Sequence, residues 1–172
     1  METKEEKSGK MMWYRAFRKA SYGSIVGALV FTVLIALPFA PFSSMPPIII
    51  SGGPGYWLAL AYLLLLAAGV GGFGTLSGLV KTVEDDEKRV ISKALMWPGF
   101  VLLSIGFASS CVLLALAGAA GGYASVVDGE SVTAITNLLS PYTLPITVST
   151  LTAVIGAALV LWAMASARRC EP

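Results

Sequence analysis

Four long apolar stretches, separated by polar segments, set the pattern along this chain. None of them contains an Asp, Glu, Lys, Arg or His, and each reaches the ~20 residues that a helix needs to cross a hydrocarbon core of about 30 Å. Backbone groups inside such a core must be bonded within the segment itself, so each stretch is expected to be helical. The pattern therefore predicts membrane-spanning helices at residues 23–42, 56–80, 94–122 and 144–167.

Four segments lie on the inner side of these spans in this interpretation. Residues 1–10 are charged and predict a mobile tail, while residues 11–22 combine aromatic and basic side chains in an amphipathic pattern typical of a membrane interface. Residues 81–93 predict a charged loop whose four consecutive acids are solvated and bind no metal. Residues 168–172 form the second tail.

The two outer connections differ in the structure that their sequences predict. Residues 43–55 are rich in Pro and Gly and predict a hairpin at the membrane surface, in which two successive prolines keep the backbone extended. A re-entrant turn that contacts an ion or a ligand is the alternative for this stretch. Residues 123–143 predict a loop with a short interfacial helix, capped by Asp128 or Ser131.

The distribution of charge orients the chain. All 12 Lys and Arg residues precede the first span, lie between the second and third spans, or follow the fourth. Basic residues collect on the cytoplasmic side of membrane proteins, so both termini are expected there. The predicted fold class is an all-α integral membrane protein, a four-transmembrane-helix bundle with an amphipathic N-terminal segment and a short outer interfacial helix.

Composition agrees with this fold class and indicates the kind of organism. The chain is 56% hydrophobic and 13% charged, too apolar for a soluble domain of its length. It contains no Gln and a single Asn, Asn137, and this depletion of thermolabile amides suggests a heat-adapted organism. With its four spans, we expect a multi-pass protein of a prokaryotic cell membrane.

Small residues recur at helical spacing in every span and predict close contacts between helices. The candidate helix-packing positions are Gly23, Gly27, Ala68, Gly72, Gly74, Gly78, Gly106, Gly118 and Gly156. A second set combines aromatic and basic side chains at the ends of the spans and predicts membrane anchoring. These candidates are Trp13, Tyr14, Arg15, Phe17, Tyr56, Trp57 and Trp97.

The residue types that carry most chemistry are missing from the spans. Without His, and with Cys111 and Cys170 on different levels of the membrane, the chain cannot build a bis-His haem, copper, zinc or thiol-redox site. We expect no catalytic residue, no metal and no cofactor bound by this chain alone, although contact with lipid or quinone is compatible with the sequence. Asp128 and Glu130 are the only outer charges and are candidates for an outer contact.

Three functions are compatible with these observations. The first is a non-catalytic accessory or structural subunit of a larger membrane complex, such as a respiratory complex of the terminal-oxidase type. Its partners would be other integral membrane subunits and lipids, with no nucleic acid. The second is a small channel or facilitator for a neutral solute, lined by Thr75, Ser104, Ser109 and Ser110. The third is an outer-face, lipid- or quinone-interacting enzyme subunit that uses Asp128 and Glu130.

Overall fold

The computed structural model describes residues 4–39, 41–51, 53–83 and 89–169. The acids at 84–87, which we expect in a solvated loop, lie outside the described residues, as do the ends of both predicted tails.

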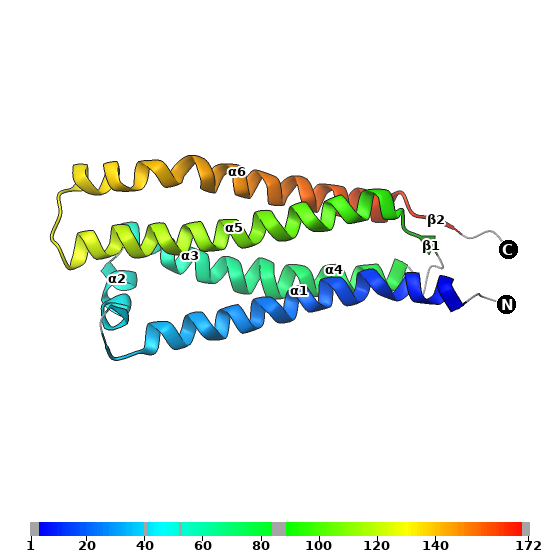
Figure 1. Cartoon of the computed structure of the whole chain (residues 1–172), viewed down its shortest axis with the longest axis horizontal. Coiled ribbons are helices and arrows are strands. Elements are labelled where there is room, and N and C mark those ends of the chain that lie inside the picture. The colour runs from blue at the N-terminus through cyan, green and yellow to red at the C-terminus, as the bar shows by residue number, and fades with distance from the viewer. Residues whose placement is uncertain (1–3, 40, 52, 84–88, 170–172) are drawn as a thin grey trace.

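Four long helical rods lie side by side, and both chain termini lie at the same end (Figure 1). We call it the basic end, because the lysines and arginines of the sequence precede the first rod's apolar part, lie between the second and third rods, or follow the fourth. Each rod is long and apolar enough to cross a membrane, which confirms the prediction of a helical-bundle membrane protein with four such helices. The first rod is α1 (Lys4–Ala36), and the third and fourth are α5 (Lys93–Val126) and α6 (Val132–Ala165). The second rod joins α3 (Tyr56–Leu64), a π-helical segment η3 (Leu65–Gly72) and α4 (Phe73–Lys81).

Helix α1 differs from the expected first span at both ends. It begins at Lys4, so the predicted tail and amphipathic segment, as far as they are described, continue directly into the span. It ends at Ala36 instead of reaching residue 42. Pro38 explains the early end, because its ring disfavours the helical conformation at Leu37 and it has no N–H to donate.

The expected extended hairpin at 43–55 is instead mostly helical. It contains η1 (Phe42–Ser44), the short helix α2 (Met45–Ser51) and η2 (Gly53–Gly55). Two of its three prolines, Pro46 and Pro47, lie in the first turn of α2, where the helix does not need their missing N–H groups. Gly53 has a φ of +58°, which returns the chain into the second rod. This segment lies across the end of the bundle opposite the basic end (Figure 1).

The expected outer loop at 123–143 is largely absorbed into helices. Only residues 127–131 separate α5 from α6, and Gly129 turns the chain there with a φ of +65°. Ser131 caps α6 by accepting a hydrogen bond from the backbone N–H of Ala134 at 3.4 Å, as predicted for one of two candidates. The predicted separate interfacial helix is therefore the first part of a continuous α6.

A pair of short strands adds to the all-α fold that the sequence predicts. Strands β1 (Arg89–Val90) and β2 (Arg168–Arg169) pair in antiparallel fashion at the basic end. This pairing joins the segment before α5 to the segment after α6, which keeps the ends of those two helices together.

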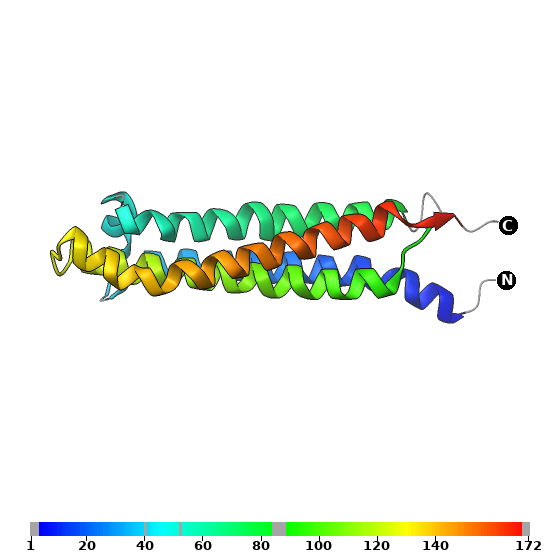
Figure 2. The ribbon, with the colours of Figure 1, turned by 90° about the horizontal axis from the view of Figure 1, so that it is seen from above.

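Helix α6 packs along α5 and makes few other contacts (Figure 2). Glycines bring the two backbones close together. A Cβ atom at Gly106 would overlap the backbone nitrogen of Ala153, and one at Gly156 would lie 2.7 Å from the Cα atom of Leu103. Real Cβ atoms do not approach so closely, so a side chain at either glycine would force the helices apart.

The other side of α5 is equally crowded. A Cβ atom at Gly118 would overlap the backbone nitrogen of Leu58 in α3, and one at Gly122 would overlap the side chain of Ile48 in α2. Ile48 is fully buried there. Helix α5 is therefore the central helix, with α6 on one side and α2 and α3 on the other.

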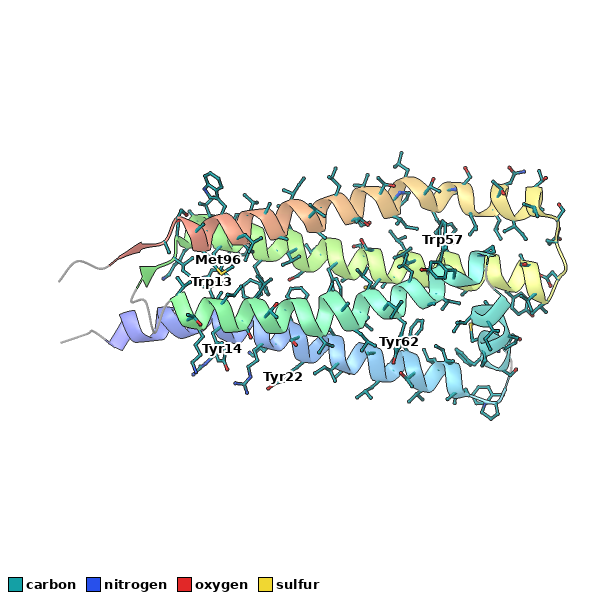
Figure 3. The ribbon with its side chains drawn as sticks, turned by 180° about the vertical axis from the view of Figure 1, so that it is seen from behind. Trp13, Tyr14, Tyr22, Trp57, Tyr62 and Met96 are labelled. Carbon is teal, nitrogen blue, oxygen red and sulfur yellow. The ribbon has the colours of Figure 1, made fainter. Side chains whose placement is uncertain are left out.

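An apolar core fills the basic end of the bundle, where aromatic rings from three rods meet. Phe17 lies 5.0 Å from Phe100 and 6.3 Å from Phe73 between ring centroids, and Trp13 lies 6.3 Å from Phe100. Figure 3 shows Trp13 beside Met96, which is fully buried in the same core. A smaller core near the opposite end contains Ala117, Ala124, Ile135 and Leu139.

We expect Gly156→Leu to separate α5 from α6, because the added side chain meets the Leu103 backbone. Overpacking costs about 1–3 kcal/mol, and each kcal/mol lowers Tm by about 2–4 °C in a chain of this size. A fall of about 5 °C or more in thermal unfolding of the detergent-solubilised protein is the expected result. Ala158→Leu, at an exposed position on the same helix, is the control and should leave Tm within about 2 °C. Equal Tm values for the two variants would contradict the close contact.

Candidate functional site

The π-helical segment Leu65–Gly72 is the main irregularity in the middle of the bundle. Its backbone carbonyls are not all paired as in an α-helix, and Ser21 of α1 donates its hydroxyl to the carbonyl of Val70 at 3.1 Å. The rod also changes its principal neighbour here, since α3 packs on α5 whereas the π segment and α4 pack on α1. Short π segments are often found at functional sites, which makes this the first place to look for one.

Gly69 places the π segment against two other rods. A Cβ atom at this position would lie 2.6 Å from the Ser24 hydroxyl of α1 and 2.8 Å from the Phe107 ring of α5. Gly69 is therefore required for this three-way contact, although it is not among the candidate packing positions. Its place in the run of small residues at 67–72 is the sequence signal that would have found it.

A cavity of about 270 Å³ lies beside this contact. It is mostly apolar and is lined by side chains from all three elements, among them Gly23, Ser24, Leu65, Ser104, Phe107 and Cys111. The Ser104 hydroxyl is buried and has no hydrogen-bond partner among the described residues. The Ser24 hydroxyl, by contrast, donates to the carbonyl of Ala20 at 3.1 Å. The cavity thus has the size for a small apolar molecule, and the unpaired Ser104 hydroxyl lies beneath its lining, because its oxygen has almost no exposed surface.

The hydroxyl groups proposed as the lining of a channel do not converge. Ser104 lines the cavity, but Ser110 is buried on the other side of α5, where its hydroxyl lies 3.3 Å from that of Thr150 in α6. Thr75 is exposed and donates to the carbonyl of Gly72 in its own helix. Within a single chain, Ser104, Ser110 and Thr75 therefore do not line one shared path.

The candidate packing glycines fall into two groups. Gly106, Gly118 and Gly156 lie at the backbone contacts of α5. An added Cβ atom at Gly27 would lie 3.4 Å from the Leu65 side chain, and one at Gly74 would lie 3.7 Å from the Ser21 hydroxyl. At the remaining glycines, an added Cβ atom would reach no other rod. Gly72 is close only to its own helix, including Ala68, and a Cβ atom at Gly23 or Gly78 would have no neighbour within 4 Å.

The candidate anchoring residues also divide. We expect Trp13 and Phe17 to lie at the membrane surface, but they are only 3% and 0% exposed and belong to the core of the basic end. The apolar face of this segment turns toward α4 and α5, since α1 is continuous and packs against them. Trp57 is half-buried against the smaller core. Arg15, Tyr56 and Trp97 are exposed, and Tyr14 is half-buried beside Arg18.

The two outer carboxylates lie in the turn between α5 and α6. Asp128 and Glu130 are both exposed, and neither lines the cavity. Within the described residues, no three His, Cys, Asp or Glu side chains come together as metal ligands would.

Comparison with protein-family models, with curated proteins and with solved structures gives no match to this chain.

The different hydrogen bonding of Ser104 and Ser21 predicts opposite effects of their removal. Ser104→Ala should leave Tm unchanged or raise it, because an unpaired buried hydroxyl is lost. Ser21→Ala should lower Tm by about 1–3 °C, since an interhelical hydrogen bond in a membrane contributes about 0.6 kcal/mol. Thermal unfolding in detergent measures both, with Ser110→Ala as a second example of a paired hydroxyl. A destabilised Ser104→Ala variant would mean that this hydroxyl has a partner.

Proposed function

We propose that this protein is a non-catalytic subunit of a larger membrane complex, joined to its partner through one exposed face of the second rod. The observation that carries the proposal is a stripe of small exposed side chains on that rod. Its members follow one another every three or four residues and so share one helix face. They are Ala67, Gly71, Thr75 and Gly78.

This stripe is open to a neighbour. A Cβ atom at Gly78 would have nothing within 4 Å, and one at Gly71 would approach only the carbonyl of Leu66 in its own helix, at 3.9 Å. Glycine within a helix costs about 0.5–1 kcal/mol relative to alanine, and lipid tails do not require it. A second helix does benefit, because small residues let two backbones approach closely and gain dispersion contacts. An exposed glycine stripe therefore favours a protein neighbour over lipid.

The host we favour is a respiratory assembly of the terminal-oxidase type in the cell membrane of a heat-adapted prokaryote, with both termini of this chain in the cytoplasm. Helical subunits without cofactors are common in such assemblies. A chain without histidine offers no imidazole ligand for haem, which fits a supporting role. The clustering of basic residues near both termini supports the proposed orientation.

Gly71→Leu should weaken assembly without unfolding the chain, because the added side chain fills the stripe and meets nothing inside the bundle. We expect recovery of the chain in its native complex to fall about tenfold or more, equivalent to about 1.4 kcal/mol. The measurement is gentle extraction from native membranes and native-gel separation, with mass spectrometry and a visible absorption spectrum of the band. Gly74→Leu is a poorer test, because Gly74 lies close to Ser21 and its replacement also disturbs packing with α1.

Ala158→Leu is the matched control, since it adds the same side chain to an exposed face of α6. Comigration of the wild-type chain with large pigmented subunits, and its loss in Gly71→Leu alone, would support the proposal. A small colourless band that contains this chain alone would overturn it.

The cavity beside the π segment favours a second candidate, a facilitator or carrier of a small neutral apolar solute. The mostly apolar walls would hold such a solute without a polar contact. This candidate does not depend on the four-residue path.

Gly23→Leu tests this second candidate, because Gly23 lines the cavity and an added Cβ there meets no atom within 4 Å. The leucine side chain should fill much of the cavity and reduce solute uptake into proteoliposomes about tenfold, with Tm maintained. Uptake of a labelled neutral solute is compared with that of Ala158→Leu vesicles. Equal uptake by Gly23→Leu, Ala158→Leu and empty vesicles would exclude transport through this cavity.

A further inference from the structure

Arg18 is held between two tyrosines on the exposed face of α1. Its Nη1 donates to the hydroxyl of Tyr14 at 2.9 Å, and its Nε donates to the hydroxyl of Tyr22 at 3.0 Å. The guanidinium carbon also lies 5.6 and 5.3 Å from the centroids of the two rings. Spacing of four residues on either side places all three side chains on one helix face. Both tyrosines therefore restrict the guanidinium, which is free to bind without first being ordered.

The donors that remain on Arg18 point to an anion. A guanidinium has five N–H groups, and the tyrosines accept from two of its nitrogens, which leaves three N–H donors. Their fork geometry matches two oxygens of a phosphate. The hollow around them has a volume of about 480 Å³. The described residues that line it are Tyr14, Arg15, Arg18, Lys19 and Tyr22, which include cations and, among these described residues, no anion. Charge complementarity thus favours a phosphate group.

The surroundings of the hollow indicate which phosphate it binds. From Tyr22 onward, the same face of α1 is exposed and apolar, with Val26, Leu29 and Val33 at helical spacing. Arg18 precedes Val26 by eight residues, or about 12 Å at 1.5 Å per residue. The headgroup region outside the hydrocarbon core is several ångströms thick on each side. With the apolar face in the hydrocarbon core, an arginine at this level, flanked by tyrosines, would lie among the phosphates of one leaflet.

We propose that the hollow around Arg18 binds the phosphate of an anionic phospholipid, whose acyl chains lie along the apolar face that includes Val26, Leu29 and Val33. A free phosphate ion would use the hollow and leave the apolar face unused, whereas a phospholipid matches both. The site is on the leaflet that faces the basic end of the bundle. It requires the membrane-spanning bundle, but not a partner protein or a transported solute.

The test separates this site from general attraction between basic residues and acidic lipid. The full chain is purified, delipidated and titrated with phosphatidylglycerol or phosphatidylcholine of the same acyl chains, and bound lipid is counted by native mass spectrometry. We expect phosphatidylglycerol to bind at least about tenfold more tightly, because its net charge is complementary to the hollow.

The deciding variant is Tyr14→Phe combined with Tyr22→Phe. It keeps every charge and both rings but removes the two hydroxyls that hold the guanidinium. We expect phosphatidylglycerol affinity to fall about threefold or more, whereas attraction by charge alone predicts no change. Arg18→Gln should lower the affinity about tenfold or more, and Lys93→Gln, which removes an exposed charge from the first turn of α5, should lower it less than twofold.

Three results would overturn the proposal. The first is that the double tyrosine variant binds phosphatidylglycerol like the wild type. The second is that Arg18→Gln and Lys93→Gln lose affinity equally. The third is that inorganic phosphate at millimolar concentration displaces the lipid completely. The first two leave only general electrostatic attraction, and the third makes this a site for a soluble anion. Because the tyrosine variant retains both rings, it tests the site even where Arg18→Gln fails to fold.

Discussion

Close backbone contact around α5 is the constraint on which the rest of the structure depends. Helices in a membrane gain little from the hydrophobic effect between them, because lipid tails are as apolar as leucine, so they associate through tight packing. Gly106 and Gly156 supply it on one side of α5 and Gly118 on the other. Since α6 has few contacts besides α5, the fourth rod is held in the bundle mainly through those two glycines and the core of the basic end.

The π segment follows from the same constraint. The second rod must pack on α5 near one end of the bundle and on α1 near the other, and a regular helix keeps the same faces toward the same neighbours. A π turn contains more residues than an α turn, so the faces of α4 are rotated relative to those of α3. The irregular backbone leaves a carbonyl for Ser21 and brings Gly69 against Ser24 and Phe107. The cavity lies next to the place where the rod changes neighbours.

Apolar length made the four spans predictable, but it could not place their ends. Pro38 ends α1, whereas Pro141 and Pro145 lie inside α6. Local sequence does not distinguish these cases, because helices of a membrane bundle tolerate proline when other groups bond the freed carbonyls. Two-residue strands such as β1 and β2 are too short to leave a periodic pattern.

The candidate sites were harder to predict for a related reason. An apolar face such as that of Trp13 and Phe17 has the same period whether it meets lipid or another helix, so only the packing shows that it is core. The small residues of the second rod are equally ambiguous in sequence, since Gly69 is buried whereas Gly71 and Gly78 face outward. The spacing of Tyr14, Arg18 and Tyr22 was visible in the sequence, but their hydrogen bonds were not.

The exposed faces of the rods differ in the size of their side chains. Helix α6 presents bulky side chains such as Leu151, Val154 and Leu161, and α1 presents Val26 and Leu29. Disordered acyl chains pack against such surfaces without needing a fixed shape. A glycine groove excludes less volume and offers fewer side-chain contacts, so it gains most from a rigid partner of complementary shape. A bundle that needed glycine only for its internal contacts would not require it at Gly71 and Gly78, which is why we propose an outside helix as their neighbour.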